Sequence, residues 1–330
     1  MFSTGMPAKA GEVIGPQAAA VLETLRLDKL FAGSSDIASR CDGVVSHWPQ
    51  MGMDRSDYLV RGEVGWMVDR PRLDAALRQM AIESGCLWLG AKVLSCRRLE
   101  SRGFELTVRH GNEVEIVNAE LVVDATGRPA KIARQLGARC RVDDWLVAAA
   151  ASLPRRGRQA DPFLRLTATP QGWWYRSDGP AGDIRIACIA DPTLTGSKPS
   201  TLANHLRNIA QEQGFTPAYS AIASPIVHMD ASSGQLECCA QDGWLAVGDA
   251  ATKFDPFTGQ GLAQAFASAL SAAHAAREHL AGNNLALVTY DHAIQATYRF
   301  SRKHLDVRYA HHAWREQSVF WRARKAACAT

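Results

Sequence analysis

The sequence predicts an α/β fold in which a layer built on parallel strands is interleaved with a β-rich domain and followed by a helical C-terminal region. Two apolar segments, 119–125 and 244–247, have the character of strands buried in a parallel sheet, although they lie far apart in the chain. A long alanine-rich helix is predicted after the second strand, at 260–281. Strand-like patterns fill most of the intervening chain, which indicates that this part forms a domain of its own.

The N-terminal part alternates helical and strand-like patterns. Apolar residues at helical spacing predict one helix over 15–30 and another over 71–84. Between them, 46–67 is irregular and predicts short strands and loops. Strand-like segments separated by turn-forming residues then predict a β-meander with strands at 92–98, 104–109 and 114–117.

The β-rich region begins near Trp145 and ends near Met229. We expect its strands at 163–168, 173–176 and 184–190, and one helix at 199–213. The final helical region begins near Leu285, carries many basic residues and ends near Arg324.

Composition and charge exclude several classes of protein. The chain has 330 residues, of which 47% are hydrophobic and 21% charged, as in an ordinary globular protein of one or two domains. No apolar run approaches the roughly 18 residues of a membrane-spanning helix, and the first residues lack the order of a secretory signal. A cytoplasmic location is expected. The net charge of +4 is mild, so we expect no nucleic-acid partner.

The cysteines and histidines indicate no metal. The eight cysteines show no C-x-x-C spacing, and therefore neither a zinc site nor a disulfide framework is expected. The ten histidines form no ligand spacing with carboxylates or cysteines. Solvated or capping roles account for them.

The first motif is Asp124-Ala125-Thr126-Gly127, which ends an apolar strand. A glycine directly after a strand permits a positive φ angle and a close approach of the backbone to a ligand. An ordinary turn from strand to loop explains this short pattern equally well.

The second motif is longer and more specific. A buried strand leads to Gly248-Asp249, where an acceptor-only carboxylate can bind a ribitol or ribose hydroxyl. The turn Gly259-Gln260-Gly261 then opens a helix, whose free amides and positive dipole end suit a phosphate or an electron-rich ring edge. A chance succession of strand, loop and helix is the alternative.

These motifs resemble those of a known superfamily. Gly-Asp-Ala-Ala followed by Asp-Pro-x-x-Gly-Gln-Gly is similar to the flavin-binding motif of class A flavoprotein monooxygenases and flavin-dependent halogenases, and Asp-Ala-Thr-Gly matches its companion motif. The resemblance implies a Rossmann-like layer that binds FAD, with NADH or NADPH as reductant. It implies that the cofactor is contacted by Arg70, Asp124, Gly127, Gly248, Asp249, Pro256, Gly259, Gln260 and Gly261. For Arg70, a solvated arginine at a helix start is the alternative.

Three further segments, 11–16, 65–70 and 309–322, resemble the branch that modifies peptides or proteins during maturation of tryptophylquinone-type cofactors. This resemblance implies hydroxylation of an aromatic substrate, either a small molecule or a tryptophan within a peptide or protein. The candidate walls of a substrate pocket are Trp48, Trp66, Trp173 and Trp174. For one of Trp173 and Trp174, packing in the core or on a sheet face is the preferred alternative. No catalytic acid or base is assigned.

The sequence also departs from the superfamily. The segment before Gly11 does not contain the strand, Gly-x-Gly-x-x-Gly turn and helix of a first βαβ unit. We therefore expect an unpaired strand edge, exposed apolar surface and weakened FAD binding. One alternative function is a non-catalytic, FAD-deficient partner that binds a polypeptide. The other is a halogenase, which is disfavoured because 172–176 lacks the Ile-Pro of the halogenase motif and no catalytic lysine can be assigned.

The predicted domains are discontinuous. The FAD-binding domain is expected to comprise 1–44, 67–144 and 241–284, including the β-meander. The β-rich substrate domain takes 45–66 and 145–240, and the C-terminal helical region takes 285–330.

Overall fold

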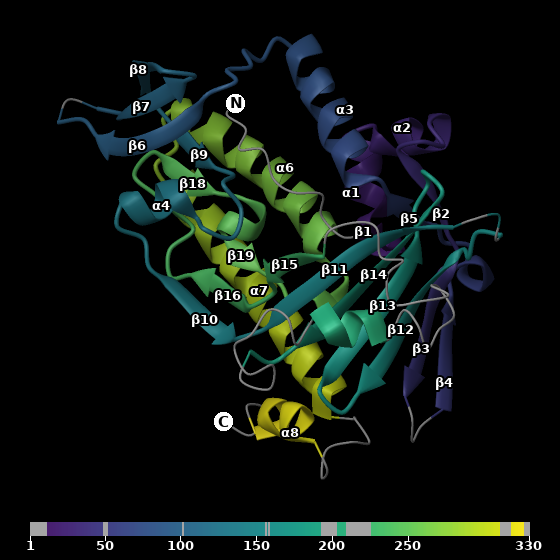
Figure 1. Cartoon of the computed structure of the whole chain (residues 1–330). Helices are drawn as coiled ribbons and strands as arrows, with labels where there is room; N and C mark the ends of the chain where they lie inside the picture. The colour runs from purple at the N-terminus through teal and green to yellow at the C-terminus, as the bar shows by residue number, and fades with distance from the viewer. Residues whose placement is uncertain are drawn as a thin grey trace. The chain divides into compact units, whose positions relative to one another are not determined.

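A computed structural model describes residues 12–48, 52–100, 102–155, 157, 159–192, 203–208, 226–310 and 318–326 (Figure 1). The chain divides into two compact units. The described part of the first unit lies within 75–144 and 233–301, and that of the second within 7–74, 145–232 and 302–330. The chain is therefore interleaved, with each unit built from separate stretches of sequence.

The first unit contains the two strands that the sequence predicts to be neighbours. β9 (Val122–Asp124) and β18 (Trp244–Ala246) pair in parallel, with Val123 opposite Leu245. β17 (Ala240–Gln241) completes the sheet in the order β17-β18-β9. Within the described part of the chain, β9 ends this sheet, and 45% of Val123 is exposed. An exposed apolar side chain therefore lies at this end of the described sheet, and the expected unpaired edge stays a prediction.

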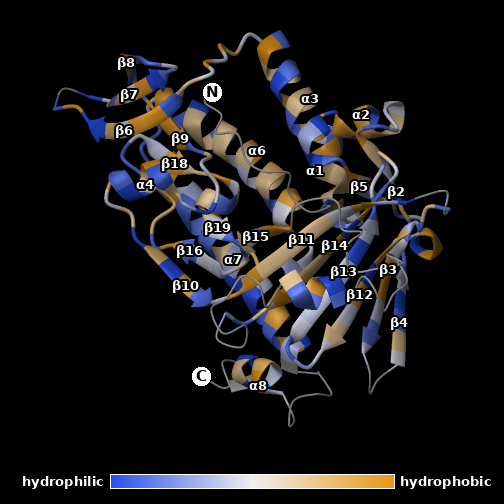
Figure 2. Ribbon diagram, in the orientation of Figure 1, coloured by the Kyte–Doolittle hydropathy of each residue, from blue (hydrophilic) through white to orange (hydrophobic). Residues whose placement is uncertain are grey.

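The other elements of the first unit surround this sheet. The predicted β-meander is confirmed as β6 (Lys92–Arg98), β7 (Phe104–His110) and β8 (Glu113–Ala119). A second antiparallel sheet consists of β10 (Cys140–Asp144), β16 (Ser233–Leu236) and β19 (Thr252–Lys253). The helices are α4 (Lys131–Gln135) and α6 (Gly261–Leu280), with the first part of α7 (Ala286–Ala310). Figure 2 shows α6 as mostly weakly hydrophobic, in keeping with its alanine content.

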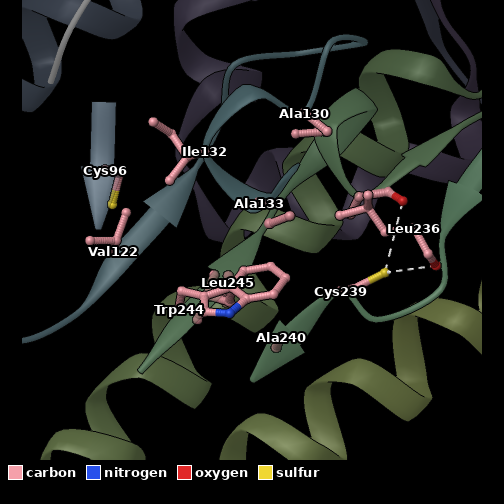
Figure 3. Packing of buried hydrophobic residues seen from close by; sticks show 14 of the residues in the cluster. Cys96, Val122, Ala130, Ile132, Ala133, Leu236, Cys239, Ala240, Trp244 and Leu245 are labelled. Atoms are coloured by element: carbon pink, nitrogen blue, oxygen red, sulfur yellow. Dashed lines mark hydrogen bonds between the residues drawn. The ribbon is translucent and has the colours of Figure 1, made fainter. Parts of the chain in front are cut away.

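The core of this unit packs around β18 (Figure 3). Trp244 and Leu245 are almost fully buried and lie among residues from the meander, α4 and the segment before β18. Cys239 is fully buried, and its Sγ lies 3.9 Å from the carbonyl oxygen of Leu236 and 3.8 Å from that of Ala251. Burial raises the pKa of this thiol, and nearby Asp291 adds to the rise. Cys239 therefore behaves as a small core residue.

The second unit is built on a seven-stranded sheet in the order β15-β11-β14-β13-β12-β3-β4. All neighbours are antiparallel except β12 and β3, which are parallel. The strands are β3 (Gly43–Trp48), β4 (Gly52–Asp57), β11 (Val147–Pro154), β12 (Phe163–Thr169), β13 (Gly172–Asp178), β14 (Asp183–Ala190) and β15 (Val227–Asp230). The predicted strands of the β-rich region are therefore present.

A three-stranded antiparallel sheet, β1-β5-β2, also belongs to the second unit. Its strands are β1 (Glu12–Ile14), β2 (Ala38–Cys41) and β5 (Gly65–Val68), and η2 (Leu59–Arg61) precedes β5. The single helix expected over 15–30 is wrong in detail, because the chain forms η1 (Pro16–Ala18), α1 (Ala19–Thr24) and α2 (Leu27–Gly33). The break lies at Arg26, whose φ of 58° is left-handed and cannot continue a helix.

The remaining predicted helices are confirmed where the structure describes them. α3 (Arg70–Glu83) matches the helix expected over 71–84. Residues 203–208 are helical, and the rest of the helix expected at 199–213 lies outside the described residues. The C-terminal region contains α7 and α8 (Val319–Ala326), with 311–317 outside the described residues. None of the described helices is long and apolar enough to cross a membrane.

The two units follow packing, and their limits differ from those of the predicted functional domains. Both divisions separate the chain near 144. The described residues up to Asp74 pack with the second unit because β1, β2 and β5 form one sheet, whose end is bonded to Arg185 on β14. Residues 285–301 pack with the first unit. The functional assignment of the domains stays a prediction.

Candidate functional site

Two loops meet where β9 and β18 end. The two strands run in parallel, so their carboxyl ends lie at one edge of the sheet, and the amide of Val247 donates to the carbonyl of Asp124 at 3.0 Å. The loop after β9 therefore lies beside the loop after β18. Between them, Nε of Arg128 lies 3.5 Å from Oδ2 of Asp249. Both sequence motifs contribute to one place in the first unit.

Asp124 shapes the first loop. Its carboxylate is buried, and Oδ1 accepts hydrogen bonds from the amide and hydroxyl of Thr126 at 2.9 and 2.7 Å. Oδ2 accepts from the amide of Ala133 at 2.8 Å, which satisfies one of the free amides at the start of α4. The carboxylate thus ties strand, loop and helix together, and its predicted contact with a cofactor stays a prediction.

The loop between β9 and α4 is tightly bent. The hydroxyl of Thr126 accepts from the amide of Lys131 at 2.7 Å. Gly127 has a φ of 73°, and Ala130, which is buried, has a φ of 45°. A left-handed alanine is strained, and such strain is concentrated at functional sites. A Cβ added at Gly127 would have no neighbour within 4 Å, so the space beside this glycine is open.

The second loop packs closely against α6. It begins with η3 (Gly248–Ala250), and Gly248 has a φ of 55°. A Cβ on Gly248 would lie 3.3 Å from that of Ala265, while its amide donates to Oγ of Ser268 at 2.9 Å. The left-handed conformation therefore favours glycine, and α6 leaves little room for a Cβ. The side chain of Asp249 remains 32% exposed and presents a carboxylate at the edge of the sheet.

The N-terminus of α6 follows a short capped turn, η4 (Pro256–Thr258). The buried Asp255 caps this turn, because its Oδ1 accepts from the amide of Phe257 at 2.8 Å. α6 itself begins without a side-chain cap. Its first amides and its positive dipole end therefore remain suited to an electron-rich group.

Gln260 and Pro256 occupy supporting positions. The side chain of Gln260 accepts a hydrogen bond from Oγ of Ser301 at 2.7 Å, so it is bonded to α7. Its backbone, at the position before α6, is the part that a ligand at this helix end could meet. Pro256 is half-buried at the first position of η4, where its missing amide costs nothing.

The residues present fit a flavin. Gly127, Gly259 and Gly261 would each place a Cβ in open space, with no neighbour within 4 Å. The φ angles of Gly127 and Gly259 are positive, but that of Gly261 is not, so neither the backbone nor the packing of the protein requires glycine at 261. A flat ligand lying against the start of α6 would require it. Asp249 supplies an acceptor for hydroxyl groups, and the helix end supplies positive potential.

Arg70 belongs to the second unit, whereas the two loops and the start of α6 belong to the first. Its Nη1 lies 2.9 Å from both carboxylate oxygens of Glu12, and its Nε lies 2.6 Å from Asp74. Burial acts to lower the pKa of Arg70, but the charges of Glu12 and Asp74 outweigh it and raise the pKa. Its predicted contact with a cofactor stays a prediction.

The four tryptophans proposed as pocket walls have different surroundings. Trp48 packs edge-on against Trp321 of α8, and Trp66 packs against Phe31 of α2. Trp173 and Trp174 are adjacent on β13 and therefore point to opposite faces of the sheet. Trp174 belongs to a buried cluster with Ile186 and Cys188, whereas Trp173 lies 6.1 Å from the ring of Tyr175. Any role of these residues in substrate binding stays a prediction.

The structure adds two charged residues that the motifs alone do not predict. Arg128 directly follows the first motif, and that position was its one signal in the sequence. Arg185 is buried in the second unit and bonds Asp69, Asp183 and the carbonyl of Val68. Val68 and Asp69 are distant from Arg185 in sequence, so this hydrogen-bond network cannot be recognised before the pairing of the strands is known. Among the described residues, no group of three or more His, Cys, Asp or Glu could hold a metal ion.

Comparison with known proteins agrees with these motifs. Residues 47–177 match the family model of tryptophan halogenase. An FAD-dependent oxidoreductase, LodB, from Marinomonas mediterranea is 23% identical over 71% of this chain and 64% of its own length. Menaquinone reductase from Mycobacterium tuberculosis is 25% identical over 76% of this chain and 63% of its own. The chain thus spans less than two thirds of the length of these curated relatives.

Two solved structures share the fold. The myxobacterial chondrochloren halogenase CndH has a TM-score of 0.85 and 18% identity, covering 98% of this chain and 79% of its own. The peptidyl tryptophan dihydroxylase QhpG, essential for tryptophylquinone cofactor biogenesis, has a TM-score of 0.79 and 19% identity, covering 98% of this chain and 72% of its own. The family-model match and the curated relatives support the resemblance to class A flavoprotein monooxygenases and flavin-dependent halogenases, and the solved structures show that the chain shares their fold.

Proposed function

We propose that the chain functions as an FAD-dependent monooxygenase. Its aromatic substrate would be a tryptophan within a peptide or protein. The observation that carries the flavin-binding part is the joint arrangement of the two loops and the start of α6, with open space beside Gly127, Gly259 and Gly261. The choice of substrate is supported by the fold shared with the peptidyl tryptophan dihydroxylase.

The residues of the first unit would bind and orient the cofactor. Asp249 would accept hydrogen bonds from the ribityl hydroxyls, and the start of α6 would stabilise negative charge on the ring. Asp124 would hold the first loop in place for that contact. When bound, reduced FAD supplies the oxygen-activating chemistry, with NADH or NADPH as the source of electrons.

The second unit would recognise the substrate on its large sheet. Trp173 and Tyr175 lie on the same face of β13, where the indole and phenol rings are 6.1 Å apart. Burial raises the pKa of Tyr175, and the charge of Glu12 raises it further, against the opposing effect of Arg185. The phenol is therefore neutral at physiological pH and would serve as a hydrogen-bond donor beside an aromatic surface.

The test of flavin binding uses the purified chain and two variants. The chain is mixed with FAD and desalted, and the visible absorbance that remains is measured. Asp249→Ala should lose most of the bound flavin, because it removes the hydroxyl acceptor, whereas Glu237→Ala, an exposed carboxylate in the same unit, should retain it. Equal retention by wild type and Asp249→Ala would remove Asp249 from the site.

A second experiment separates the proposed reaction from the halogenase alternative, which the family-model match favours. The chain with FAD, reductant, oxygen and chloride is incubated with a tryptophan-containing peptide, and the product is identified by mass spectrometry. Insertion of oxygen supports the monooxygenase. Replacement of hydrogen by chlorine supports the halogenase, and peptide binding without FAD or product supports the polypeptide-binding partner.

A further inference from the structure

Arg128 lies on a loop that the protein holds firmly. It directly follows Gly127, and the loop on which it lies is fixed by the bonds of Asp124 and Thr126 to the first turn of α4. Its side chain is only 23% exposed, and its Nε lies 3.5 Å from Oδ2 of Asp249. The guanidinium is thus positioned at the edge where β9 and β18 end, and it is not a freely moving surface group.

Several backbone amides of the two loops around Arg128 are bonded within the protein. The amide of Gly248 donates to Ser268, and that of Ala250 donates to Val247 within the same loop. In the first loop, the amides of Thr126 and Lys131 donate to Asp124 and to Thr126, and Pro129 has no amide hydrogen. These particular amides are therefore not available to an anionic ligand.

Side chains can also provide positive charge next to these loops. Lys131 is directed elsewhere, because its Nζ donates to the carbonyl of Val93 in the β-meander at 2.7 Å. Arg134 lies on the exposed side of α4. Arg128 is the cation that both loops hold in place, beside the carboxylate expected to contact the ribityl chain.

We propose that Arg128 binds the diphosphate of the flavin dinucleotide and so sets the preference of the site for FAD over riboflavin. This inference rests on the flavin-binding function proposed above. A guanidinium is planar and has five donors, so one edge can pair with a carboxylate while another binds phosphate oxygens. Asp249 would then address the ribityl hydroxyls, which both flavins carry, and Arg128 would address the diphosphate, which only the dinucleotide carries.

Calorimetric titration of the chain with FAD, riboflavin and ADP tests this assignment. The variants are Arg128→Gln, Asp249→Ala and, as the matched control, Arg134→Gln. Arg128→Gln should weaken FAD and ADP about tenfold or more, as expected for a lost charge-assisted contact, and leave riboflavin unchanged. Asp249→Ala should weaken FAD and riboflavin alike, and Arg134→Gln should change none of the three. Thermal unfolding of each variant verifies that it is folded.

The outcomes distinguish a failure of the Arg128 assignment from a failure of the flavin-binding proposal. If Arg128→Gln weakens riboflavin as much as FAD, or weakens neither, Arg128 does not bind the diphosphate, while flavin binding by the wild type still stands. If the wild type binds ADP in an Arg128-dependent manner but binds no flavin, the diphosphate assignment stands and the flavin proposal fails. If the wild type binds none of the three, both fail.

Discussion

At the scale of single residues, the charged side chains of this protein divide into those that hold the fold and those that face the site. Asp124 and Arg185 belong to the first group, because each is buried and makes three hydrogen bonds within the protein. Asp249 belongs to the second group, with a partly exposed carboxylate. Aspartate thus has a structural role in the first motif, at Asp124, and faces the site in the second motif, at Asp249.

Arg185 provides the sharpest prediction about stability. Arg185→Met would leave the carboxylates of Asp69 and Asp183, with side chains 12% and 21% exposed, without their partner. The free energy of unfolding should fall by about 3–5 kcal/mol, since removing one member of a buried pair leaves an uncompensated charge. Urea denaturation of the purified variant measures the change.

The control is Arg40→Met, which removes a pair with Asp42 in the same unit where the arginine side chain is 52% exposed. That substitution should cost about 1 kcal/mol or less. A cost for Arg185→Met no larger than that for Arg40→Met would contradict the structural role given to Arg185.

The sequence predicts Asp249 and the glycines of the site because their signal is local: a strand, a fixed spacing and a helix start. It does not predict the partners of Gln260 or Arg70, since Ser301 and Glu12 are distant in sequence and become neighbours only through tertiary packing. Resemblance assigned these residues a type of role, and the side-chain contacts depend on the complete fold.

At the scale of elements, the start of α6 combines local helix physics with open space. Gly261 is the first residue of this helix and lacks a positive φ angle.

The long alanine-rich pattern predicts α6 to within a residue at each end. The break at Arg26 was missed because the apolar pattern there continues through a left-handed residue. Periodicity records which faces are buried and not where the backbone turns.

Gly261→Ala should therefore stabilise the fold and impair the site. Alanine is favoured over glycine in a helix by about 0.5–1 kcal/mol, and the added Cβ meets nothing in the protein. The same methyl group would occupy the space proposed for the ring, so FAD affinity should fall. Thermal unfolding and FAD titration of one preparation measure both effects.

Gly33→Ala in α2 is the matched control, because its Cβ also lies in open space and its φ is not positive. It should leave FAD affinity unchanged. If Gly261→Ala bound FAD as tightly as the wild type, the ring could not lie against the start of α6.

At the scale of the whole molecule, two interleaved units contain thiols and phenols that are kept neutral by burial. Burial raises the pKa of Cys188 from 9.0 to about 12 and that of Tyr58 from 10.0 to about 12. These groups deprotonate at lower pH in the unfolded chain than in the folded one. Their contribution to stability is therefore complete below about pH 9 and is lost as the pH rises toward 12.

The free energy of unfolding should thus decline with pH above about 9, by up to about 1.4 kcal/mol per pH unit for each such group. Cys188→Ala should flatten part of this decline, whereas Cys86→Ala, at an exposed cysteine, should keep the slope of the wild type. Urea denaturation at a series of pH values measures the slopes. Identical slopes for wild type and Cys188→Ala would show that this thiol does not contribute.

The interleaving itself was predictable because two distant strands carried the same buried, apolar character and each ended in a motif. The limits of the units were not predictable, since they depend on which sheet the first strands join. β1, β2 and β5 pair with one another in the second unit. Pairing between distant segments leaves little trace in a single sequence.

The central claim is that the loops after β9 and β18 and the start of α6 form a flavin site. An equilibrium titration of FAD with the purified chain, followed by the visible absorption of the ring, tests it most directly. We predict a saturable spectral change that is weakened by Asp249→Ala and by Gly261→Ala and retained in Gly33→Ala. An unchanged FAD spectrum at saturating protein, or identical titrations for the wild type and Asp249→Ala, would contradict the claim.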